Sequence, residues 1–448
     1  MNDSGTSVIS RRRFLEAAAA LAAIPLPARA AATAFGALRP DPRGVLDLPE
    51  GFSYTVISRS GEEMDDGLIV PARPDGMAAF AGPDDTVTLV CNHENSPRSG
   101  GPFGEMNERL HKVDASNIYD LGSGETPGAG GTTTLVYNPE ARQTVHQHLS
   151  LAGTEVNCAG GPTPWGSWLS CEECFEQPGQ ESQRGRTISR DRRHGYVFEV
   201  PASERSLVEP VPLKDMGRFE HEAAAVDPES GAIYLTEDRH SGLFYRFIPN
   251  RSGELRQGGR LQALKIDGAT GFDTRNWEQA DMPLGEWLAA RWIDLDDVDS
   301  DENDLRIRGR ANGAAVFARG EGLCIADDSA FFTATIGGPA RLGQLFEYRN
   351  RNGGELRLFA ESTGASLLHH ADNLTMSPWG DLIVCEDTAA NCGLVGVAPD
   401  GTQYPLANHP YSTSELAGVC FAPDGRTLFV NIQHRGLTLA IHGRWPQA

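Results

Sequence analysis

One pattern recurs along the chain: a short apolar strand that ends in polar, mostly acidic, residues. Several copies follow a turn rich in Pro, Asp and Gly. The six copies are 86–94, 167–173, 232–238, 330–335, 381–387 and 427–433. Repeated units that cannot bury a core alone are typical of folds that arrange copies side by side around or along an axis. The pattern therefore predicts an all-β fold, a six-bladed β-propeller with loop insertions.

The remaining sequence agrees with many short strands and frequent turns. The chain has 50 Gly and 28 Pro, and helical periodicity is scarce outside a short stretch from Asn276 to Leu288. Residues 101–131 are rich in Gly, Ser and Pro, which predicts a long loop. Residues 251–311 are polar and acidic, which predicts a second elaboration of the fold.

The N-terminus has the features of an export signal. Arg11, Arg12 and Arg13 precede Phe14 and Leu15, an Ala/Leu/Ile run covers 17–24, and 28–30 reads Ala-Arg-Ala. This order predicts a twin-arginine signal over residues 1–30, recognised by the twin-arginine translocation machinery and then removed. The apolar run is too short to cross a bilayer. We therefore expect a mature propeller domain of residues 31–448 that is periplasmic or secreted.

The charge of the chain restricts its partners. The formal net charge is −22, which disfavours nucleic acids and anionic membranes. An anionic substrate would need bound cations or a local arginine to be attracted. No other apolar run is long enough to be a membrane-spanning helix.

Four of the six repeated strands end in carboxylates that a propeller would direct toward one channel. The acids expected to converge are Glu94, Glu172, Glu173, Glu222, Glu237, Asp238, Glu386 and Asp387. Such a cluster needs bound cations, because carboxylates that share a site repel one another. Oxygen ligands suit calcium, magnesium or manganese, and the thiolate of Cys171 would admit iron or zinc. The alternative is a set of unrelated strands whose acids face solvent.

Two further segments resemble loops of a site. Residues 217–222 contain an Arg, a His and two Glu, and residues 317–322 place Arg319 beside Glu321 between glycines. An arginine fork is a bidentate clamp for phosphate or carboxylate, although an ordinary surface ion pair would give the same pattern. Familiar nucleophile motifs such as G-x-S-x-G are absent from the sequence. The residues therefore favour metal-assisted hydrolysis.

Residues 157–173, with the sequence NCAGGPTPWGSWLSCEE, resemble the signature of the PhoX alkaline phosphatase family. Residues 217–222, 372–373, 380–387, 415–418 and 431–433 resemble its later blocks. The resemblance implies a six-bladed propeller whose channel holds two ferric ions and three calcium ions around a bridging oxo group. It also implies release of phosphate from varied monoesters outside the cytoplasm.

The same resemblance implies roles for individual residues. Cys171 would bind iron, and Glu222 and Glu321 would bind or bridge iron. Arg319 would hold the phosphate, and His221 would support the ligands. Further ligands, mostly to calcium, would be Glu94, Asn157, Glu173, Asp238, Asp372 and Glu386. One departure is Arg435, where the family pattern has Pro.

Three functions remain open from the sequence. The first is a phosphomonoesterase in which metals and Arg319 bind the phosphoryl oxygens. The second is another metal-dependent propeller hydrolase, such as a calcium-dependent lactonase or a sulfatase. The third is a non-catalytic propeller that binds partners in the periplasm and needs no buried acid cluster.

Overall fold

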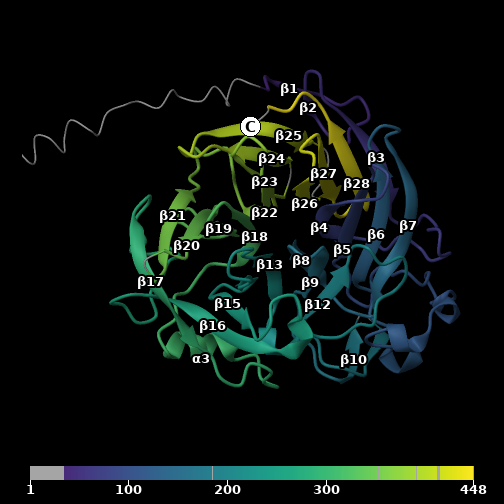
Figure 1. Cartoon of the computed structure of the whole chain (residues 1–448), viewed down its shortest axis with the longest axis horizontal. Helices are drawn as coiled ribbons and strands as arrows, with labels where there is room; N and C mark the ends of the chain where they lie inside the picture. The colour runs from purple at the N-terminus through teal and green to yellow at the C-terminus, as the bar shows by residue number, and fades with distance from the viewer. Residues whose placement is uncertain (1–34, 184, 352, 390, 411–413, 447–448) are drawn as a thin grey trace, which may run out of the picture.

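The computed structural model describes residues 35–446 except 184, 352, 390 and 411–413. The predicted export signal, residues 1–30, lies outside the described residues. The strands surround a central axis in a propeller-like arrangement (Figure 1), so the all-β prediction is confirmed. Among the described residues, no helix has both the length and the apolar character that crossing a membrane requires.

Three sheets have four strands each, paired antiparallel. The first sheet contains β4 (Pro74–Ala81), β5 (Val87–His93), β6 (Gly131–Asn138) and β7 (Gln143–Ala152). The second sheet contains β22 (Ala371–Met376), β23 (Leu382–Glu386), β24 (Cys392–Val397) and β25 (Gln403–His409). The third sheet contains β26 (Leu416–Phe421), β27 (Thr427–Ile432), β28 (Leu437–His442) and β3 (Ser53–Arg59).

Two other large sheets complete the arrangement. One has three strands: β8 (Asn157–Pro162), β9 (Ser167–Glu172) and β12 (Val197–Pro201). The other has nine strands, of which the first five are β13 (His221–Val226), β14 (Ile233–Glu237), β15 (Phe244–Pro249), β16 (Gly259–Ile266) and β17 (Trp287–Asp294). Its last four are β18 (Gly320–Ala326), β19 (Ser329–Ala334), β20 (Gln344–Arg349) and β21 (Glu355–Glu361), joined to the rest by the pairing of β17 with β21.

Small elements lie outside these sheets. Two short hairpin-like pairs are β1 (Leu38–Arg39) with β2 (Leu48–Pro49), and β10 (Gly179–Gln183) with β11 (Arg186–Arg190). The 3-10 turns are η1 (Leu110–Lys112), η2 (Ala115–Asn117), η3 (Gly122–Gly124), η4 (Lys214–Met216) and η5 (Leu255–Gln257).

Six strands line the axis, and we call them the inner strands: β4, β8, β13, β18, β22 and β26. Each inner strand contacts the next in this order, and β26 contacts β4, so the ring is closed. The closure joins distant parts of the chain, because β3 pairs antiparallel with β28 (Figure 1). A sheet shared by both ends of the chain leaves no open edge at the junction.

The six repeated segments form β5, β9, β14, β19, β23 and β27, so each copy is a strand, as predicted. Each copy pairs with an inner strand and is therefore the second strand outward from the axis, which we call a second strand. These strands read as continuous apolar runs because neighbouring sheets cover both of their faces. For example, Leu89 and Cys91 of β5 pack in one cluster with Cys420 and Phe429 of the adjacent sheet.

The two predicted elaborations differ in their secondary structure: the first is a loop, whereas the second, residues 251–311, contains β16, β17 and a short helix. Residues 101–130 form a long connection with three 3-10 turns, as the composition predicts. The predicted helix from Asn276 to Leu288 is wrong. Asn276 has φ +55°, its side chain bonds the backbone of Met282, and β17 begins at Trp287. Within the described residues the α-helix is α3, Leu305–Ala311.

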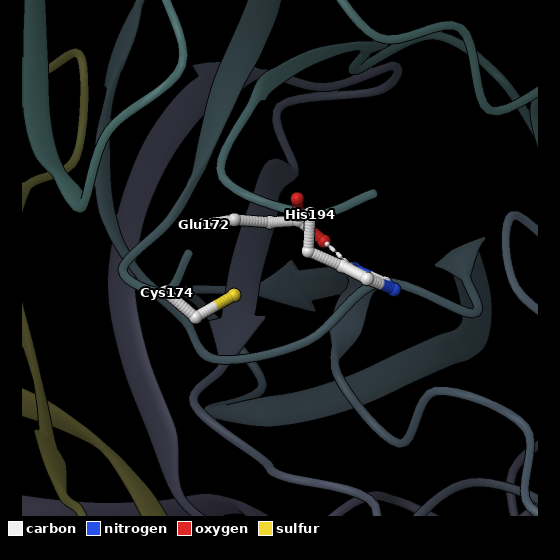
Figure 2. A group of neighbouring side chains, drawn as sticks. All are labelled: Glu172, Cys174 and His194. Atoms are coloured by element: carbon white, nitrogen blue, oxygen red, sulfur yellow. Dashed lines mark hydrogen bonds and ion pairs between the residues drawn. The ribbon is translucent and has the colours of Figure 1, made fainter. Parts of the chain in front are cut away.

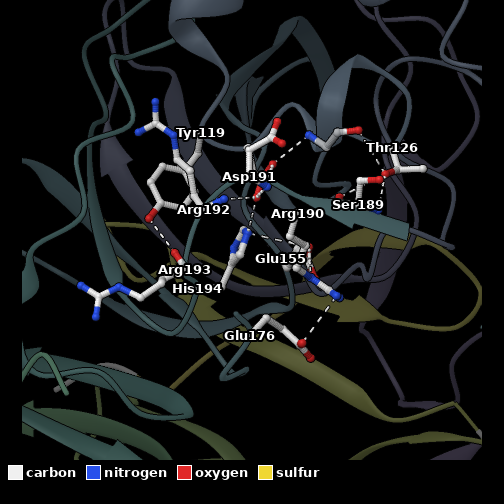
Figure 3. A network of polar contacts seen from close by, with 12 residues as sticks. Tyr119, Thr126, Glu155, Glu176, Ser189, Arg190, Asp191, Arg192, Arg193 and His194 are labelled. Atoms are coloured by element: carbon white, nitrogen blue, oxygen red, sulfur yellow. Dashed lines mark hydrogen bonds and ion pairs between the residues drawn. The ribbon is translucent and has the colours of Figure 1, made fainter. Parts of the chain in front are cut away.

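A network of polar contacts fastens the first elaboration to the segment around β11 (Figure 3). The hydroxyl of Thr126 donates to the carbonyl of Ser189 at 3.1 Å and accepts the N–H of the same residue at 2.9 Å. The hydroxyl of Tyr119 donates to the carbonyl of Arg193 at 2.7 Å. The long loop is therefore held in place by specific hydrogen bonds.

Candidate metal centre

All six inner strands begin with the same local geometry. The residue after each second strand donates its N–H to the carbonyl of the residue before the inner strand, at 2.8 to 3.3 Å. The donor–acceptor pairs are Glu94 with Arg73, Glu173 with Val156, Asp238 with Glu220, Thr335 with Arg319, Asp387 with His370, and Gln433 with Glu415. Each inner strand also has a register shift near its start. Such bulges redirect side chains at sheet ends.

This geometry defines three sets of equivalent positions. The rim positions precede the inner strands: Arg73, Val156, Glu220, Arg319, His370 and Glu415. The strand-end positions follow the second strands: Glu94, Glu173, Asp238, Thr335, Asp387 and Gln433. The inner positions are the second residues of the inner strands: Asp75, Cys158, Glu222, Glu321, Asp372 and Ala417. Carboxylates dominate all three sets taken together.

Side chains from these positions form three groups whose ligand atoms lie within 4.8 Å of one another. The groups are Cys158 with Glu173 and Glu222, Glu222 with Glu321 and Asp372, and Asp75 with Glu94 and Glu415. Glu222 belongs to two groups, so those two are continuous. The channel thus collects oxygen ligands and one sulfur ligand in the spacing that metal ions require.

The electrostatics of the cluster are unfavourable without added positive charge. Burial, followed by the carboxylates of Glu321 and Glu173, raises the pKa of Glu222 well above its ordinary value. Burial and Asp387 raise the pKa of Asp372 to about 7. Burial and neighbouring acids raise the pKa of Glu415 to about 10. Bound cations would reverse these shifts, because they favour the charged carboxylates.

Glu222 carries the clearest sign of a missing partner. Both of its carboxylate oxygens are buried, and neither has a hydrogen-bond partner among the described residues. A buried polar group without a partner costs about 2–7 kcal/mol, and a charged one more. A cation between Glu222, Cys158 and Glu173 would supply the missing interaction. The carboxylates fit calcium, and the thiol adds a soft ligand that fits iron.

The protein supplies some positive charge at the rim. Nε and Nη2 of Arg319 donate to the two oxygens of Asp238, both at 2.7 Å, and Nη2 lies 3.0 Å from Glu321. Arg73 pairs with Glu94. The amide of Gln433 donates to Asp75 at 2.7 Å and to Glu94 at 2.6 Å. These groups partner the rim side of the cluster and leave Glu222 without a partner.

The structure brings together most of the residues predicted from the sequence. Seven of them occupy the equivalent positions around the channel: Glu94, Glu173, Glu222, Asp238, Arg319, Glu321 and Asp372. Cys171, Asn157, Glu386 and His221 lie elsewhere.

Cys171 does not lie among the carboxylates. Its side chain is fully buried in an apolar cluster with Val197 and Phe219, and burial raises its pKa. The thiol that lies among the acids is Cys158, beside Glu173 and Glu222. Cys158 occupies an inner position, while Cys171 is a core residue of a second strand.

Asn157 and Glu386 hold backbone in place. The side-chain oxygen of Asn157 accepts the N–H of Gly131 at 2.7 Å, and its amide donates to Ser170 at 2.8 Å. Glu386 accepts the N–H of His369 at 2.7 Å and of Gly393 at 3.0 Å. Glu386, the last residue of β23, therefore serves the sheet, and the next residue, Asp387, holds a strand-end position.

His221 precedes Glu222 on β13. Its ring stacks on Phe219 with centroids 3.6 Å apart, and its Nε2 lies 3.0 Å from the carbonyl oxygen of Gly217. Burial lowers the pKa of His221 to about 3, so the ring is neutral. His221 therefore packs in the apolar core next to Glu222 in the sequence, and its buried Nδ1 has no hydrogen-bond partner among the described residues.

Sequence reasoning missed Asp75, Cys158 and Glu415. A signal for the inner positions exists: an acid or a Cys is followed by a small residue, as in Asp75-Gly76 and Glu321-Gly322. The small residue is needed because inner strands approach closely. A Cβ on Gly76 would lie 2.5 Å from Cα of Ala159, and one on Gly322 would lie 2.6 Å from Cα of Asn373.

Beyond these small residues the channel changes character. A cavity of about 430 Å³ is lined by apolar side chains of the inner strands, including Met77, Leu323, Leu374 and Val419. The acids therefore gather at one end of the channel, and the other end is apolar.

A fourth group, Glu172, Cys174 and His194, also has metal-like spacing (Figure 2). The carboxylate of Glu172 and the ring nitrogens of His194 already have hydrogen-bond partners within the protein. Glu172 accepts the N–H groups of Glu155, Gly195 and Tyr196, and Nδ1 of His194 at 2.7 Å. Nε2 of His194 lies 3.1 Å from Asp120.

The histidine of this fourth group is positively charged. Burial alone would lower the pKa of His194, but Glu172 and Asp120 raise it to about 10. A ring that is protonated on both nitrogens has no lone pair for a metal. In the same network, Nε and Nη2 of Arg190 donate to the two carboxylate oxygens of Glu155, at 2.8 and 2.9 Å (Figure 3). We therefore assign this group a structural role.

Comparisons with known proteins agree with this architecture. The sequence matches the family described as alkaline phosphatase PhoX over residues 33–141 and 104–436. The structure resembles that of Pseudomonas fluorescens PhoX in complex with vanadate, a transition-state analogue. The TM-score is 0.68, the identity 18%, and the match covers 89% of this chain and 96% of that one. A Xanthomonas campestris gluconolactonase gives a TM-score of 0.39 at 14% identity, covering 91% and 97%. No curated protein sequence matches the chain.

Proposed function

Because the chain belongs to the PhoX alkaline phosphatase family, we propose that it is an exported, metal-dependent phosphatase that hydrolyses phosphate monoesters at the acidic end of its channel. Family membership supports the phosphatase activity. The structure of Pseudomonas fluorescens PhoX, which this chain resembles, contains vanadate, a transition-state analogue. The twin-arginine pattern in residues 1–30 supports export to the periplasm or the medium.

We further propose that residues 31–448 form one propeller domain of six blades. The nine-stranded sheet then counts as two blades, one starting at β13 and one at β18. The support is the identical hydrogen bond and bulge at the start of all six inner strands.

The proposed metals are iron and calcium. Cys158, Glu173 and Glu222 fit iron, because they combine a thiol with carboxylates, and Glu222 continues this group to Glu321 and Asp372. Asp75, Glu94 and Glu415 offer only oxygen ligands, which fit calcium. Asp238 and Asp387 lie at neighbouring positions and would complete the ligand set.

The residues of the channel divide the work of phosphate transfer. Bound metal ions would supply Lewis acidity and an activated oxygen nucleophile. Arg319 would clamp two phosphoryl oxygens with its guanidinium fork and stabilise the charge that develops during transfer. Asp238 and Glu321 contact that guanidinium and fix its orientation. His221, next to Glu222 on β13, would help to keep it in position.

The unpartnered carboxylate of Glu222 is the observation that carries this proposal, and its substitution tests it. Glu222→Gln keeps the size of the side chain but removes the charge shared by two ligand groups. We expect loss of iron and calcium by elemental analysis, and hydrolysis of an aryl phosphate reduced by at least about a thousandfold, since metals supply several kcal/mol of transition-state stabilisation.

The matched control is Glu229→Gln at an exposed position, which should keep both metal and activity. Full activity in Glu222→Gln with its metals lost would contradict the proposal. Turnover of lactones or sulfate esters without phosphomonoesters would instead favour a different hydrolase. Absence of stoichiometric metal from protein purified through its own export route would favour a binding propeller.

A further inference from the structure

Arg319 has a counterpart on the opposite side of the channel. Arg73 and Arg319 both hold rim positions, and their carbonyls accept the equivalent N–H of Glu94 and Thr335, both at 2.9 Å. The contacts between inner strands run in the order β4, β8, β13, β18, β22, β26 and back to β4. Arg73 precedes β4 and Arg319 precedes β18, so the two arginines face each other across the axis.

The two arginines also share their conformation and their surroundings. Their φ angles are +49° for Arg73 and +55° for Arg319. Val156 and His370, at two other rim positions, have +49° and +48°, so this conformation belongs to the start of the inner strands rather than to the arginines. Each arginine side chain is 30% exposed and paired with a strand-end acid, Glu94 or Asp238.

Arg73 retains unused hydrogen-bonding capacity. Its Nε is buried without a partner among the described residues, and its Nη1 lies 3.3 Å from Nε2 of His434. Its Nη2 contacts Glu94, which also accepts from Gln433 and belongs to an oxygen-only ligand group. A cation bound by Glu94 would therefore compete with Arg73 and leave its guanidinium available to an anion at the rim.

We propose that Arg73 binds a second anionic group of the substrate, so that the enzyme favours phosphate monoesters whose alcohol part carries a further phosphate or carboxylate. This inference rests on the proposed function and specifies its substrate class. With the transferred phosphoryl group at Arg319, the alcohol part extends across the mouth of the channel toward Arg73. A guanidinium fork suits phosphate and carboxylate alike. It also gives a polyanionic ester a local attraction on a chain of net charge −22.

The test compares phenyl phosphate with 4-carboxyphenyl phosphate and a sugar bisphosphate, using the metal-loaded protein. In Arg73→Gln we expect KM for the two substrates with a second anion to rise about tenfold, the loss of one charge-assisted hydrogen bond. The ratio of kcat/KM for these two substrates to kcat/KM for phenyl phosphate should fall by the same factor. Arg73→Lys should restore part of the difference. Arg98→Gln removes the same charge from an exposed residue after Glu94 and should change nothing.

Equal KM changes for all substrates, or no change for any, would overturn the inference, and so would a loss of metal from Arg73→Gln. If the wild-type protein hydrolyses none of these esters, the proposed function fails separately. In that case, calorimetry tests the role of Arg73 by comparing the affinities of the metal-loaded protein for pyrophosphate and for phosphate. The inference predicts tighter binding of pyrophosphate, lost in Arg73→Gln. An unchanged preference in that variant would refute it.

Discussion

Two buried groups of acids lie close together in this molecule and are treated in opposite ways. Around His194, the carboxylates of Asp120, Glu155 and Glu172 are paired with the imidazole ring, with Arg190 and with backbone N–H groups. Figure 3 shows Arg190 against Glu155. In the channel, neither oxygen of Glu222 has a hydrogen-bond partner in the part of the chain that the structure describes, and burial with neighbouring acids raises its pKa.

The difference shows which property identifies a metal centre. Both groups contain acids at metal-like spacing, so the density of acids alone does not separate them. The number of satisfied hydrogen bonds does, because a buried charge that the protein itself neutralises needs no external cation. On this criterion the channel is the candidate metal centre, while the His194 network is neutralised by the protein itself.

Removal of metal should produce the largest contrast between the two groups. Chelation of the native protein should abolish phosphatase activity, by at least about a thousandfold, because several kcal/mol of transition-state stabilisation disappear. It should also destabilise the fold, since the channel acids then repel one another unless they take up protons. Activity assays and thermal unfolding before and after chelation, with calcium and iron added back, check this. Full activity after complete metal removal would contradict it.

His194→Gln should affect stability rather than metal. Removing the imidazolium leaves three buried carboxylates with one cation fewer, which costs about 3–5 kcal/mol. We expect denaturant unfolding to report this loss, while the metal content of the folded protein stays that of the wild type.

The matched control for that variant is His148→Gln. His148 is also buried, but burial lowers its pKa to about 4, so the ring is neutral. Its replacement should cost clearly less than that of His194. A loss of bound metal in His194→Gln would show that the two groups are not independent.

The sequence predicts the strands and the acids but not the direction of each side chain. Apolar runs that end in polar residues predict all six second strands, because the pattern follows from burial on both faces. In each of the doublets Glu172-Glu173, Glu237-Asp238 and Glu386-Asp387, the first acid accepts backbone N–H groups and the second holds a strand-end position. The bulge of each inner strand and the backbone donors of the next hairpin decide which acid faces the channel. These long-range contacts are not visible in a local pattern.

The last prediction asks which of two cysteines, Cys158 or Cys171, is the sulfur ligand of the metal centre. It has the smallest expected change in stability. Cys171→Ser places a hydroxyl in the apolar cluster with Val197 and Phe219, and should cost about 1–3 kcal/mol in the free energy of unfolding with iron retained. Cys158→Ser replaces a half-buried thiol beside Glu173 and Glu222, and should lower iron content and activity with little loss of stability. Elemental analysis and denaturant unfolding of both variants separate the cases. If Cys171→Ser loses iron and Cys158→Ser keeps it, the thiol ligand is the one that the sequence resemblance implied, and the channel as described lacks its sulfur.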